Sequence, residues 1–373
     1  MPDLDLVFRN ARLVDGSGGP SRHGDLAVHG GRIAAVGAVP QGAGREEIDV
    51  GGKALAPGFI DVHTHDDRAV FATPDMTMKA SQGVTTVVVG NCGISLAPIV
   101  FDGRDPPPPL DLLGRREAYR FRSFAAYLQA VDADPPAINA ACLVGHSTLR
   151  VGTMTALDRP ASATELDAMK ARLGEALDAG AIGMSTGLFY QPAAAAPPEE
   201  VEALASLLAP AGAIYTTHMR DEADRVLDSL DETFAVGRRT GTPVVVSHHK
   251  CVGRNNFGRT SETLPKLEAA MQELKVGLDA YPYHASSTVL RPVMVEFSEK
   301  VLVTWSVPHP EMAGRDLADL VAFDPDTVID RATFEKPAVP SEGILMTLVA
   351  GTPVWQNGRS TGARPGRALR RGR

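Results

Sequence analysis

Residues 83–93 read GVTTVVVGNCG. The run from Thr85 to Val89 contains only β-branched residues, which is typical of a strand that is buried on both faces. Apolar runs recur at 59–63, 138–144, 181–185, 213–217, 244–247 and 276–280, and helical patterns such as 163–179 and 198–208 lie between several of them. Strands that alternate with helices predict an α/β fold with a parallel sheet. Seven such units in a row favour a TIM-type (β/α) barrel over an open doubly wound sheet, which stays the alternative.

The two ends of the chain have a different rhythm. Residues 1–55 alternate short β runs with glycine-rich turns, which predicts a small antiparallel sheet. After Trp305, short β runs return at 318–324, 344–349 and 353–355. We therefore expect a small β domain formed by both ends, 1–55 and 318–373, beside a barrel at 56–317. Because only seven barrel strands precede the second β segment, we expect the barrel to lack its eighth strand.

Composition narrows the functional classes. The chain has 373 residues, of which 44% are hydrophobic and 22% charged, as in a folded globular protein. A net charge of −8 argues against a nucleic-acid partner, and the short basic stretch 364–373, broken by Gly and Pro, is expected to be a solvated tail.

The expected compartment is the cytoplasm. No apolar run reaches the roughly 18 residues that span a membrane, and the first residues have no signal-peptide pattern. The three cysteines, Cys92, Cys142 and Cys251, are odd in number and widely spaced, which argues against a disulfide framework. No feature of the sequence determines the number of subunits.

The stretch 58–67, GFIDVHTHDD, contains the strongest chemical signal. His63 and His65 are two residues apart on a predicted strand, so their side chains point to the same face. At the carboxyl end of a barrel strand, that face opens on the active-site mouth. Paired imidazoles suit a divalent metal such as zinc, although an isolated pair also fits two solvated histidines at a strand end.

Other predicted strands also end in metal-binding residue types: Cys92, His146, His218, and His248 with His249. Each residue alone is more typical of a structural role, but their recurrence predicts a metal site. A set of Cys92, His218 and His248 would leave the fourth position of a zinc ion open, as in catalytic sites. Because such an ion lowers the pKa of bound water, the expected reaction is hydrolysis of an amide or ester carbonyl.

Six segments together resemble the D-aminoacylase branch of the amidohydrolase superfamily. They are Gly58–Asp67, Gly83–Gly93, Ser185–Tyr190, Thr217–Glu222, Ser247–Lys250 and Asp279–Tyr283. The resemblance implies a zinc-dependent enzyme that hydrolyses the amide bond of a small-molecule substrate, an N-acyl-D-amino acid, to a D-amino acid and a carboxylate. The GNCG segment at 90–93 distinguishes this branch from hydantoinases and dihydroorotases.

The resemblance also implies residue roles. Cys92, His218 and His248 would hold one zinc ion tightly, and His63 and His65 would form a second, weaker site that shares Cys92. The positions that match substrate contacts in the family are Tyr190, Lys250, Tyr281 and Ser287. Tyr190 or Lys250 would donate a hydrogen bond to the developing oxyanion, or Lys250 would instead hold the substrate carboxylate.

One family feature is missing from the sequence. After the eighth strand, the family has a catalytic aspartate in a Ser-Asp-Gly context and then a His-Pro-Arg stretch, and neither is present. We expect that an internal block was lost near 316–319, which leaves the catalytic aspartate without a counterpart unless Asp316 or Asp319 reaches the mouth.

Three functions stay open on this basis. They are an impaired N-acyl-D-amino-acid deacylase, a metal-binding remnant without turnover, and an amidohydrolase of another specificity, such as an N-acyl-D-glutamate or N-acyl-D-aspartate deacylase or a dipeptidase. An enzyme for acidic substrates needs an additional cationic group near the substrate side chain, for which Arg220 and Arg291 are candidates. We expect zinc binding to survive better than catalysis.

Overall fold

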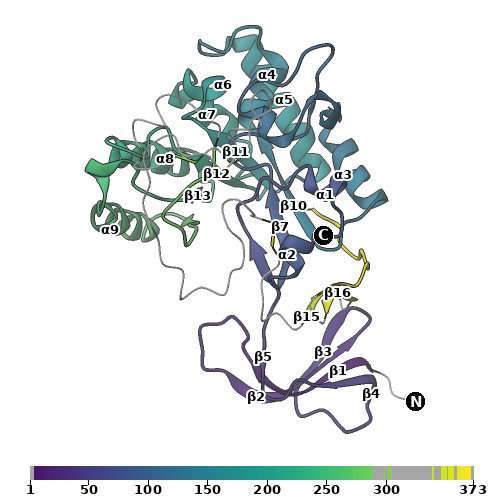
Figure 1. Ribbon diagram of the computed structural model, residues 1–373. Coiled ribbons are helices and arrows are strands. Elements are labelled where there is room, and N and C mark those ends of the chain that lie inside the picture. Colours follow the sequence, from purple (N-terminus) through teal and green to yellow (C-terminus); the bar gives the residue numbers. More distant parts are fainter. Residues whose placement is uncertain are drawn as a thin grey trace.

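The computed structural model describes residues 4–288, 298, 301–302, 304, 338–339, 346–350, 352–356 and 359–370. The first part of the chain forms a separate small sheet (Figure 1) with the order β3-β2-β1-β4, in which β5 also pairs with β1. Its strands are β1 (Leu4–Leu13), β2 (Arg22–His29), β3 (Arg32–Gly37), β4 (Gly44–Asp49) and β5 (Ala54–Leu55). β1 pairs antiparallel with β2 but parallel with β4 and β5, so this predicted antiparallel sheet is in fact mixed.

A curled parallel sheet forms the centre of the molecule. Its order is β14-β13-β12-β11-β10-β7-β6, and every neighbouring pair on this path is parallel. The strands are β6 (Phe59–Asp61), β7 (Val84–Val89), β10 (Asn139–Gly145), β11 (Gly183–Gly187), β12 (Ile214–His218), β13 (Val244–Val246) and β14 (Val276–Leu278). The seven predicted strands are confirmed, and in the described part of the chain the sheet is a half-barrel that does not close.

Helices lie between the strands and cover the outer face of this sheet (Figure 1). They are α1 (Ala69–Ala72), α2 (Thr77–Ala80), α3 (Phe124–Ala133), α4 (His146–Thr153), α5 (Ala163–Ala179), α6 (Gln191–Ala194), α7 (Pro198–Ala205), α8 (Val226–Thr240) and α9 (Thr260–Met271). Short 3₁₀ turns lie at Leu110–Leu113, Arg116–Ala118 and Arg254–Asn256, and β8 (Ile99–Val100) pairs with β9 (Arg120–Phe121). None of the described helices is long and apolar enough to cross a membrane.

Helix α5 shows how local sequence sets these boundaries. Ser162 and Glu165 form a capping box, in which each side chain accepts a hydrogen bond from the other residue's backbone N–H. Gly180 ends the helix in the left-handed conformation, which costs glycine little. The helix predicted over 163–179 is therefore confirmed at both ends.

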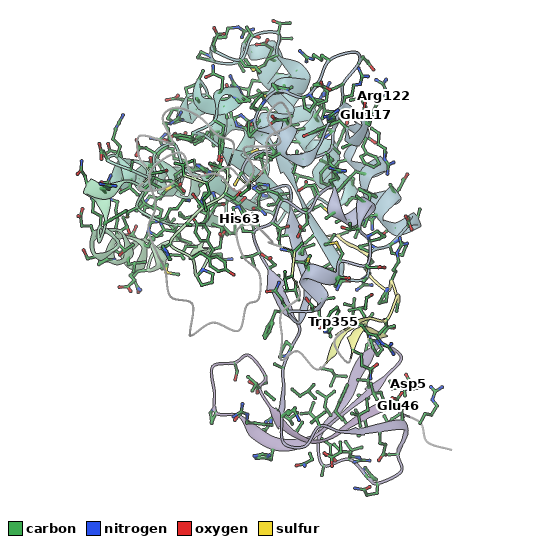
Figure 2. All side chains as sticks on the ribbon, viewed as in Figure 1. Asp5, Glu46, His63, Glu117, Arg122 and Trp355 are labelled. Atoms are coloured by element: carbon green, nitrogen blue, oxygen red, sulfur yellow. The ribbon has the colours of Figure 1, made fainter. Side chains whose placement is uncertain are left out.

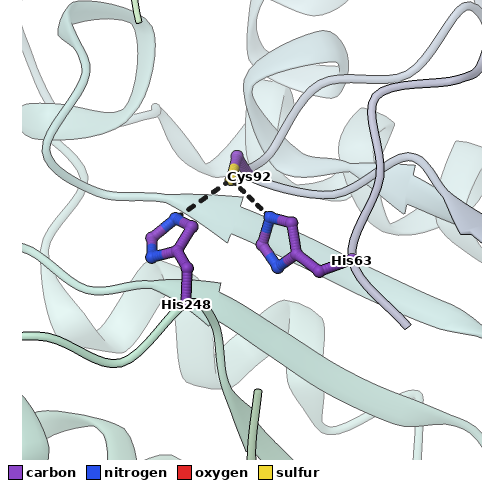
Figure 3. Close-up of side chains that lie close together, drawn as sticks. All are labelled: His63, Cys92 and His248. Atoms are coloured by element: carbon purple, nitrogen blue, oxygen red, sulfur yellow. Dashed lines mark hydrogen bonds between the residues drawn. The ribbon is translucent and has the colours of Figure 1, made fainter. Parts of the chain in front are cut away.

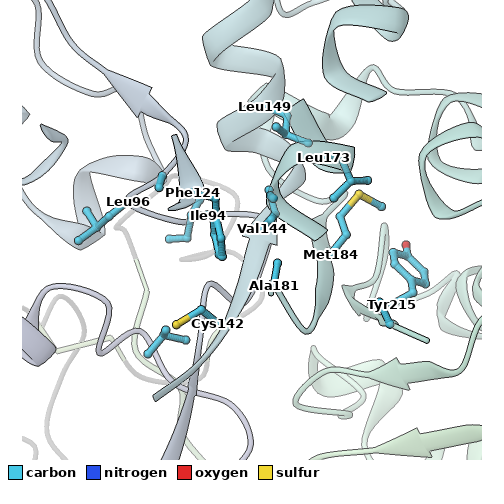
Figure 4. Packing of buried hydrophobic residues seen from close by; sticks show 14 of the residues in the cluster. Ile94, Leu96, Phe124, Cys142, Val144, Leu149, Leu173, Ala181, Met184 and Tyr215 are labelled. Atoms are coloured by element: carbon cyan, nitrogen blue, oxygen red, sulfur yellow. The ribbon is translucent and has the colours of Figure 1, made fainter. Parts of the chain in front are cut away.

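One continuous core lies between the sheet and the helices. Figure 4 shows part of it, in which side chains of the strands meet those of α3, α4 and α5. Val144 and Met184 are fully buried on the central strands, and Leu149 and Leu173 are fully buried on the helices that pack over them. Burial of this apolar area, worth about 25 cal/mol per Å², is the main force that holds the sheet and helices together.

The later part of the chain forms a third sheet with the order β15-β16-β17, made of Met346–Val349, Thr352–Gln356 and Arg359–Ser360. It packs against α2 and β7, where the Thr347 hydroxyl donates a hydrogen bond to the Ala80 carbonyl. Trp355 lies between the half-barrel and the N-terminal sheet (Figure 2). The two small sheets lie close together, as a shared β domain requires, although their described residues form no common ladder. The boundaries 1–55, 56–317 and 318–373 stay predictions.

The basic end of the chain differs from the expectation. Residues 368–369 form β18, which pairs parallel with β10 of the half-barrel. Arg364 donates a hydrogen bond to the Pro135 carbonyl, and Arg370 lies 2.7 Å from Asp132. The prediction of a solvated tail is therefore wrong for 364–370, because these arginines pair with Asp132, in the last turn of α3, and with Asp134 and the Pro135 carbonyl just after it.

Candidate metal centre

Four of the predicted ligands lie at the carboxyl ends of different strands. His63 comes two residues after β6, Cys92 three residues after β7, and His248 two residues after β13, while His218 is the last residue of β12. Since the strands are parallel, their carboxyl ends meet at one edge of the sheet. The topology therefore brings together side chains that lie up to 185 residues apart in the sequence.

Cys92 lies between two imidazoles (Figure 3). Its Sγ is 3.2 Å from Nε2 of His63 and 3.4 Å from Nε2 of His248. The centroids of the two rings are 4.8 Å apart. These three donor atoms lie within 4.8 Å of one another, so they are close enough to bind one ion.

His218, Glu222 and His248 form a second group with the same mutual spacing. The ring of His218 lies 4.4 Å from that of His248, and Glu222 Oε1 lies 2.9 Å from Nδ1 of His248. His248 is thus shared, with Nε2 toward Cys92 and Nδ1 toward Glu222. Within the described residues, Cys92, His218 and His248 do not form one such group by themselves, so the predicted tight ligand set stays a proposal.

His65 lies beside this cluster. Its ring centroid is 5.8 Å from that of His63, and it belongs to neither of the two groups. His65 is exposed, whereas His63 is half-buried. The structure therefore brings His63 to Cys92 directly and places the ring of His65 beside that of His63.

The donor set fits a zinc ion. Burial lowers the pKa values of His218 and His248, which keeps both imidazoles neutral and their ring nitrogens available as ligands. Nδ1 of His218 is buried and has no hydrogen-bond partner in the part of the chain described. Burial also raises the pKa of Cys92, so the thiol stays protonated until a cation displaces its proton. A thiolate with neutral imidazoles is a combination that zinc binds readily.

The backbone at the centre is strained. Cys92 has φ 52° and His248 has φ 37°, the left-handed region that non-glycine residues rarely adopt. Such conformations cluster at functional sites, where the surrounding structure imposes them. Gly90, two residues before Cys92, has a φ of 82°. A Cβ on Gly90 would lie 2.2 Å from the Leu143 carbonyl oxygen. Only glycine allows this turn to approach β10 and turn the thiol into the mouth.

Three of the four predicted substrate contacts lie around the same edge. The Tyr190 ring is 4.8 Å from that of His218, and Lys250 Nζ lies 5.7 Å from the ring centroid of Tyr281. Ser287 is exposed, and its neighbour Thr288 lies 3.5 Å from the Tyr190 hydroxyl. Tyr190, Lys250 and Tyr281 therefore border the mouth from separate segments, Ser287 is placed only through its neighbour, and the roles of all four stay predictions.

Two histidines from the sequence list lie elsewhere. His146 Nε2 is 3.0 Å from Glu200 in the fully buried interior of α4 and α7, and His249 Nε2 is 2.8 Å from the Thr263 hydroxyl. Neither ring belongs to the metal groups found among the described residues. A histidine at the end of a strand faces the mouth only if the next backbone dihedrals turn it there, which the sequence does not reveal.

Two carboxylates at the centre were missed by the sequence analysis. Glu222 lies 2.8 Å from Lys250 as well as beside His248, and Asp279 lies 3.2 Å from Nδ1 of His63. Burial alone would raise the pKa of Glu222, but His218, His248 and Lys250 hold it well below its usual range. Both residues stand in the segments that carried the family resemblance. For Glu222, the available signal was its position four residues after His218, a predicted ligand.

Comparison with known proteins confirms the family. The model described as "Amidohydrolase family" matches residues 46–304. The chain therefore belongs to the amidohydrolase family. It is 40% identical to a D-aminoacylase of Alcaligenes xylosoxydans xylosoxydans over 475 residues, which covers 99% of this chain and 98% of that relative. It is 50% identical to an N-acyl-D-aspartate deacylase of the same organism over 319 residues, 85% of this chain but only 64% of that relative.

Solved structures agree with the sequence relatives. A D-aminoacylase with a binuclear metal centre matches with a TM-score of 0.93 at 39% identity, covering 99% of this chain and 100% of the other. An N-acyl-D-glutamate deacylase from Bordetella bronchiseptica, complexed with zinc and a phosphonate inhibitor, matches with a TM-score of 0.89 at 36% identity, with the same coverage. The expected (β/α) architecture and the expected branch of the family are thus both confirmed.

The D-aminoacylase alignment also bears on the missing segment. It extends over 475 positions, whereas this chain has 373 residues, so at least 102 aligned positions, 475 less 373, have no counterpart here. Since the alignment covers 98% of the relative, these positions lie inside it. The expected junction near 316–319 lies outside the described residues, as does Arg291.

Proposed function

We propose that this chain is a zinc-binding amidohydrolase of N-acyl-D-amino acids whose turnover is impaired by loss of the aspartate-bearing segment. The observation that carries the proposal is the approach of His63 and His248 to Cys92, at 3.2 and 3.4 Å, in a chain that is 40% identical to a D-aminoacylase. The zinc complex of the related N-acyl-D-glutamate deacylase supports the choice of metal.

The proposed tight zinc site consists of Cys92, His218 and His248. The Nδ1 of His218, which has no hydrogen-bond partner among the described residues, and the shared position of His248 support it, since the two ring centroids are only 4.4 Å apart. His63 and His65 are proposed to form a weaker second site with Cys92. A bound zinc ion supplies Lewis acidity and lowers the pKa of a coordinated water, which is the chemistry that amide hydrolysis requires.

Lys250 is the cation nearest to these ligands among the described residues. Its Nζ lies 2.8 Å from Glu222 and donates a hydrogen bond to the carbonyl of His248. This anchoring keeps the ammonium at the edge of the mouth, where it would bind the carboxylate of an N-acyl amino acid. Tyr190, whose ring packs against His218 from the opposite segment, would donate a hydrogen bond to the developing oxyanion.

The proton transfer to the leaving amine has no assigned residue in this chain. General acid–base catalysis typically contributes 10²–10⁴-fold to a rate. We therefore expect hydrolysis to be slower by that range than in an intact relative, while substrate and zinc still bind. A chain that binds zinc but has no measurable hydrolysis is the second candidate, a metal-binding remnant.

Specificity for an acidic side chain is a further candidate, because the highest identity reported above, 50%, is to an N-acyl-D-aspartate deacylase. Arg220 does not supply the additional cation in the described structure. Its guanidinium pairs with Glu232 at 2.8 Å and donates hydrogen bonds to the carbonyls of Ala194 and Ala196. Arg291, the other candidate for this cation, lies outside the described residues, so the side-chain class of the substrate is left to the panel below.

The test is a zinc determination together with a hydrolysis assay. Purified protein is expected to contain at least one zinc per chain and to hydrolyse N-acetyl-D-methionine slowly, with N-acetyl-D-glutamate and N-acetyl-D-aspartate as the acidic panel. Cys92→Ala should lose the zinc, and Cys142→Ala, which removes a buried core thiol that belongs to neither donor group, should retain it. Wild-type protein without zinc, or with zinc content unchanged by Cys92→Ala, would contradict the proposal.

A further inference from the structure

The side chain of Asp279 lies behind the rings that face Cys92. It follows β14 and is 8% exposed. Its Oδ2 lies 3.3 Å from Nδ1 of His63 in hydrogen-bonding geometry, and its Oδ1 accepts a hydrogen bond of 2.6 Å from the backbone N–H of His248. One carboxylate therefore contacts both histidines of the Cys92 group, one through its ring and the other through its backbone.

The contact with His63 fixes the tautomer of that ring. A carboxylate only accepts hydrogen bonds, so it favours the tautomer of His63 that carries its proton on Nδ1. Nε2, which lies 3.2 Å from Cys92 Sγ, then presents its lone pair toward the centre. Metal-binding histidines commonly have their second ring nitrogen on a carboxylate, because this orients the ring and raises its basicity.

The contact with His248 holds a strained backbone. His248 has φ 37°, and a left-handed conformation at a non-glycine residue persists only where the surroundings impose it. Asp279 bonds to this segment twice, since its own carbonyl also accepts a hydrogen bond from the N–H of His249 at 2.8 Å. These bonds turn the His248 side chain back toward Cys92 instead of continuing the line of β13.

We propose that Asp279 is a positioning residue of the metal centre, which sets the tautomer of His63 and the backbone conformation of His248 so that both Nε2 atoms face Cys92. This inference rests on the proposed function, because it assumes that the cluster binds zinc. The residue it adds, Asp279, comes directly after β14 and contributes no ligand atom of its own.

Two substitutions separate the two contacts. Asp279→Asn keeps an oxygen for the His248 N–H but places an amide NH₂ where Oδ2 contacts His63, which favours the tautomer of His63 with its proton on Nε2. Asp279→Ala removes both contacts. We expect Asp279→Ala to weaken zinc binding 10–100-fold and Asp279→Asn to weaken it less. Glu200→Gln is the matched control, because Glu200 is a buried carboxylate beside a buried histidine, His146, that belongs to neither donor group.

The experiment has two measurements. Zinc affinity of the metal-free proteins is determined by competition with a chelator, with circular dichroism to check folding. Histidine ¹⁵N NMR of metal-free wild type and Asp279→Asn reports the tautomer of His63, assigned with His63→Gln, and this measurement needs only the isosteric variant. The expected result is weaker zinc binding for Asp279→Ala, a change of tautomer in Asp279→Asn, and wild-type affinity for Glu200→Gln.

The possible failures are distinguishable. Unchanged zinc affinity in a folded Asp279→Ala, or the same His63 tautomer in wild type and Asp279→Asn, would overturn the positioning role while leaving the zinc centre in place. If wild type and Cys92→Ala bound zinc equally weakly, the proposed function itself would fail, and the positioning role toward zinc would fail with it. Equal loss of affinity in Glu200→Gln would show that the effect is general destabilisation and would also overturn the role.

Discussion

The described part of the chain contains two buried clusters of a glutamate, a histidine and a cation, and they differ in what the histidine faces. In the first cluster, Glu200 lies 3.0 Å from Nε2 of His146 and forms an ion pair with Arg150. The guanidinium of Arg150 also donates to the carbonyls of Pro192 and Arg159. All three side chains are at most 3% exposed, and the free Nδ1 of His146 has no hydrogen-bond partner there.

The second cluster has the same chemistry at the edge of the sheet. Glu222 lies 2.9 Å from Nδ1 of His248 and 2.8 Å from Lys250. Here the other ring nitrogen, Nε2, lies 3.4 Å from Sγ of Cys92. The comparison teaches that a buried group of glutamate, histidine and cation does not by itself mark a functional centre. What marks it is a second donor of metal-binding type on the far side of the ring.

The largest expected effect is on the first cluster. Arg150→Ala leaves the buried carboxylate of Glu200 without its cation, and breaking a buried ion pair costs about 3–5 kcal/mol. We expect the free energy of unfolding, measured with urea, to fall by that amount. The control is Arg159→Ala, because Arg159 pairs with Glu165 near the surface, where an ion pair contributes about 0–1 kcal/mol. Equal losses in both variants would contradict the distinction between buried and surface pairs.

The next effect separates the two clusters by the property that each controls, zinc affinity or folding stability. Glu222→Gln removes the carboxylate behind His248, and loss of such a partner typically weakens metal binding 10–100-fold. Glu200→Gln should instead lower the free energy of unfolding and leave zinc affinity unchanged. Chelator competition and urea unfolding, applied to both variants, measure the two quantities. If both substitutions changed zinc affinity equally, the clusters would not have separate roles.

The pH dependence of folding stability gives a second test of the first cluster, through Glu200. Burial alone would raise the pKa of Glu200, but hydrogen bonds from His146 and Arg150 lower it from 4.5 to about 2. The pKa of Glu200 is lower in the folded than in the unfolded state. The ionised Glu200 carboxylate therefore stabilises the fold above about pH 4.5, and this contribution is lost as the pH falls toward 2. Urea unfolding at several pH values should show a shallower acid-side slope in Glu200→Gln than in wild type. An identical slope would mean that the pKa of Glu200 does not differ between the folded and the unfolded state.

The smallest effect is expected at the open edge of the sheet. Phe59 and Ile60 on β6 are 58% and 60% exposed, although their sequence resembles that of the buried strands. Phe59→Ser should change the free energy of unfolding by only about 0.5 kcal/mol, as for other surface substitutions. Val144→Ser, at a fully buried position on β10, is the matched comparison and should cost several-fold more. A large loss in Phe59→Ser would mean that β6 is covered in solution.

The sequence analysis predicted the repeating architecture correctly because buried parallel strands have a local signature. The β-branched run at 85–89 and the capped helix at 163–179 were both confirmed, since strand and helix patterns depend on residues a few positions apart. The prediction of a solvated tail at 364–370 was wrong because this segment pairs with β10 and α3, more than 200 residues away, and no local pattern encodes such pairing.

For the metal centre, the sequence by itself determined the inventory of donor types, Cys92 and the histidines at strand ends, because residue type and strand position are local properties. Only the tertiary structure decided that His63 and His248 approach Cys92 while His146 and His249 turn into the core. It also decided that Asp279 and Glu222 stand behind the rings. The physical reason is that convergence at the carboxyl edge depends on the curvature of the sheet and on a few backbone dihedrals, such as the left-handed φ of Cys92 and His248.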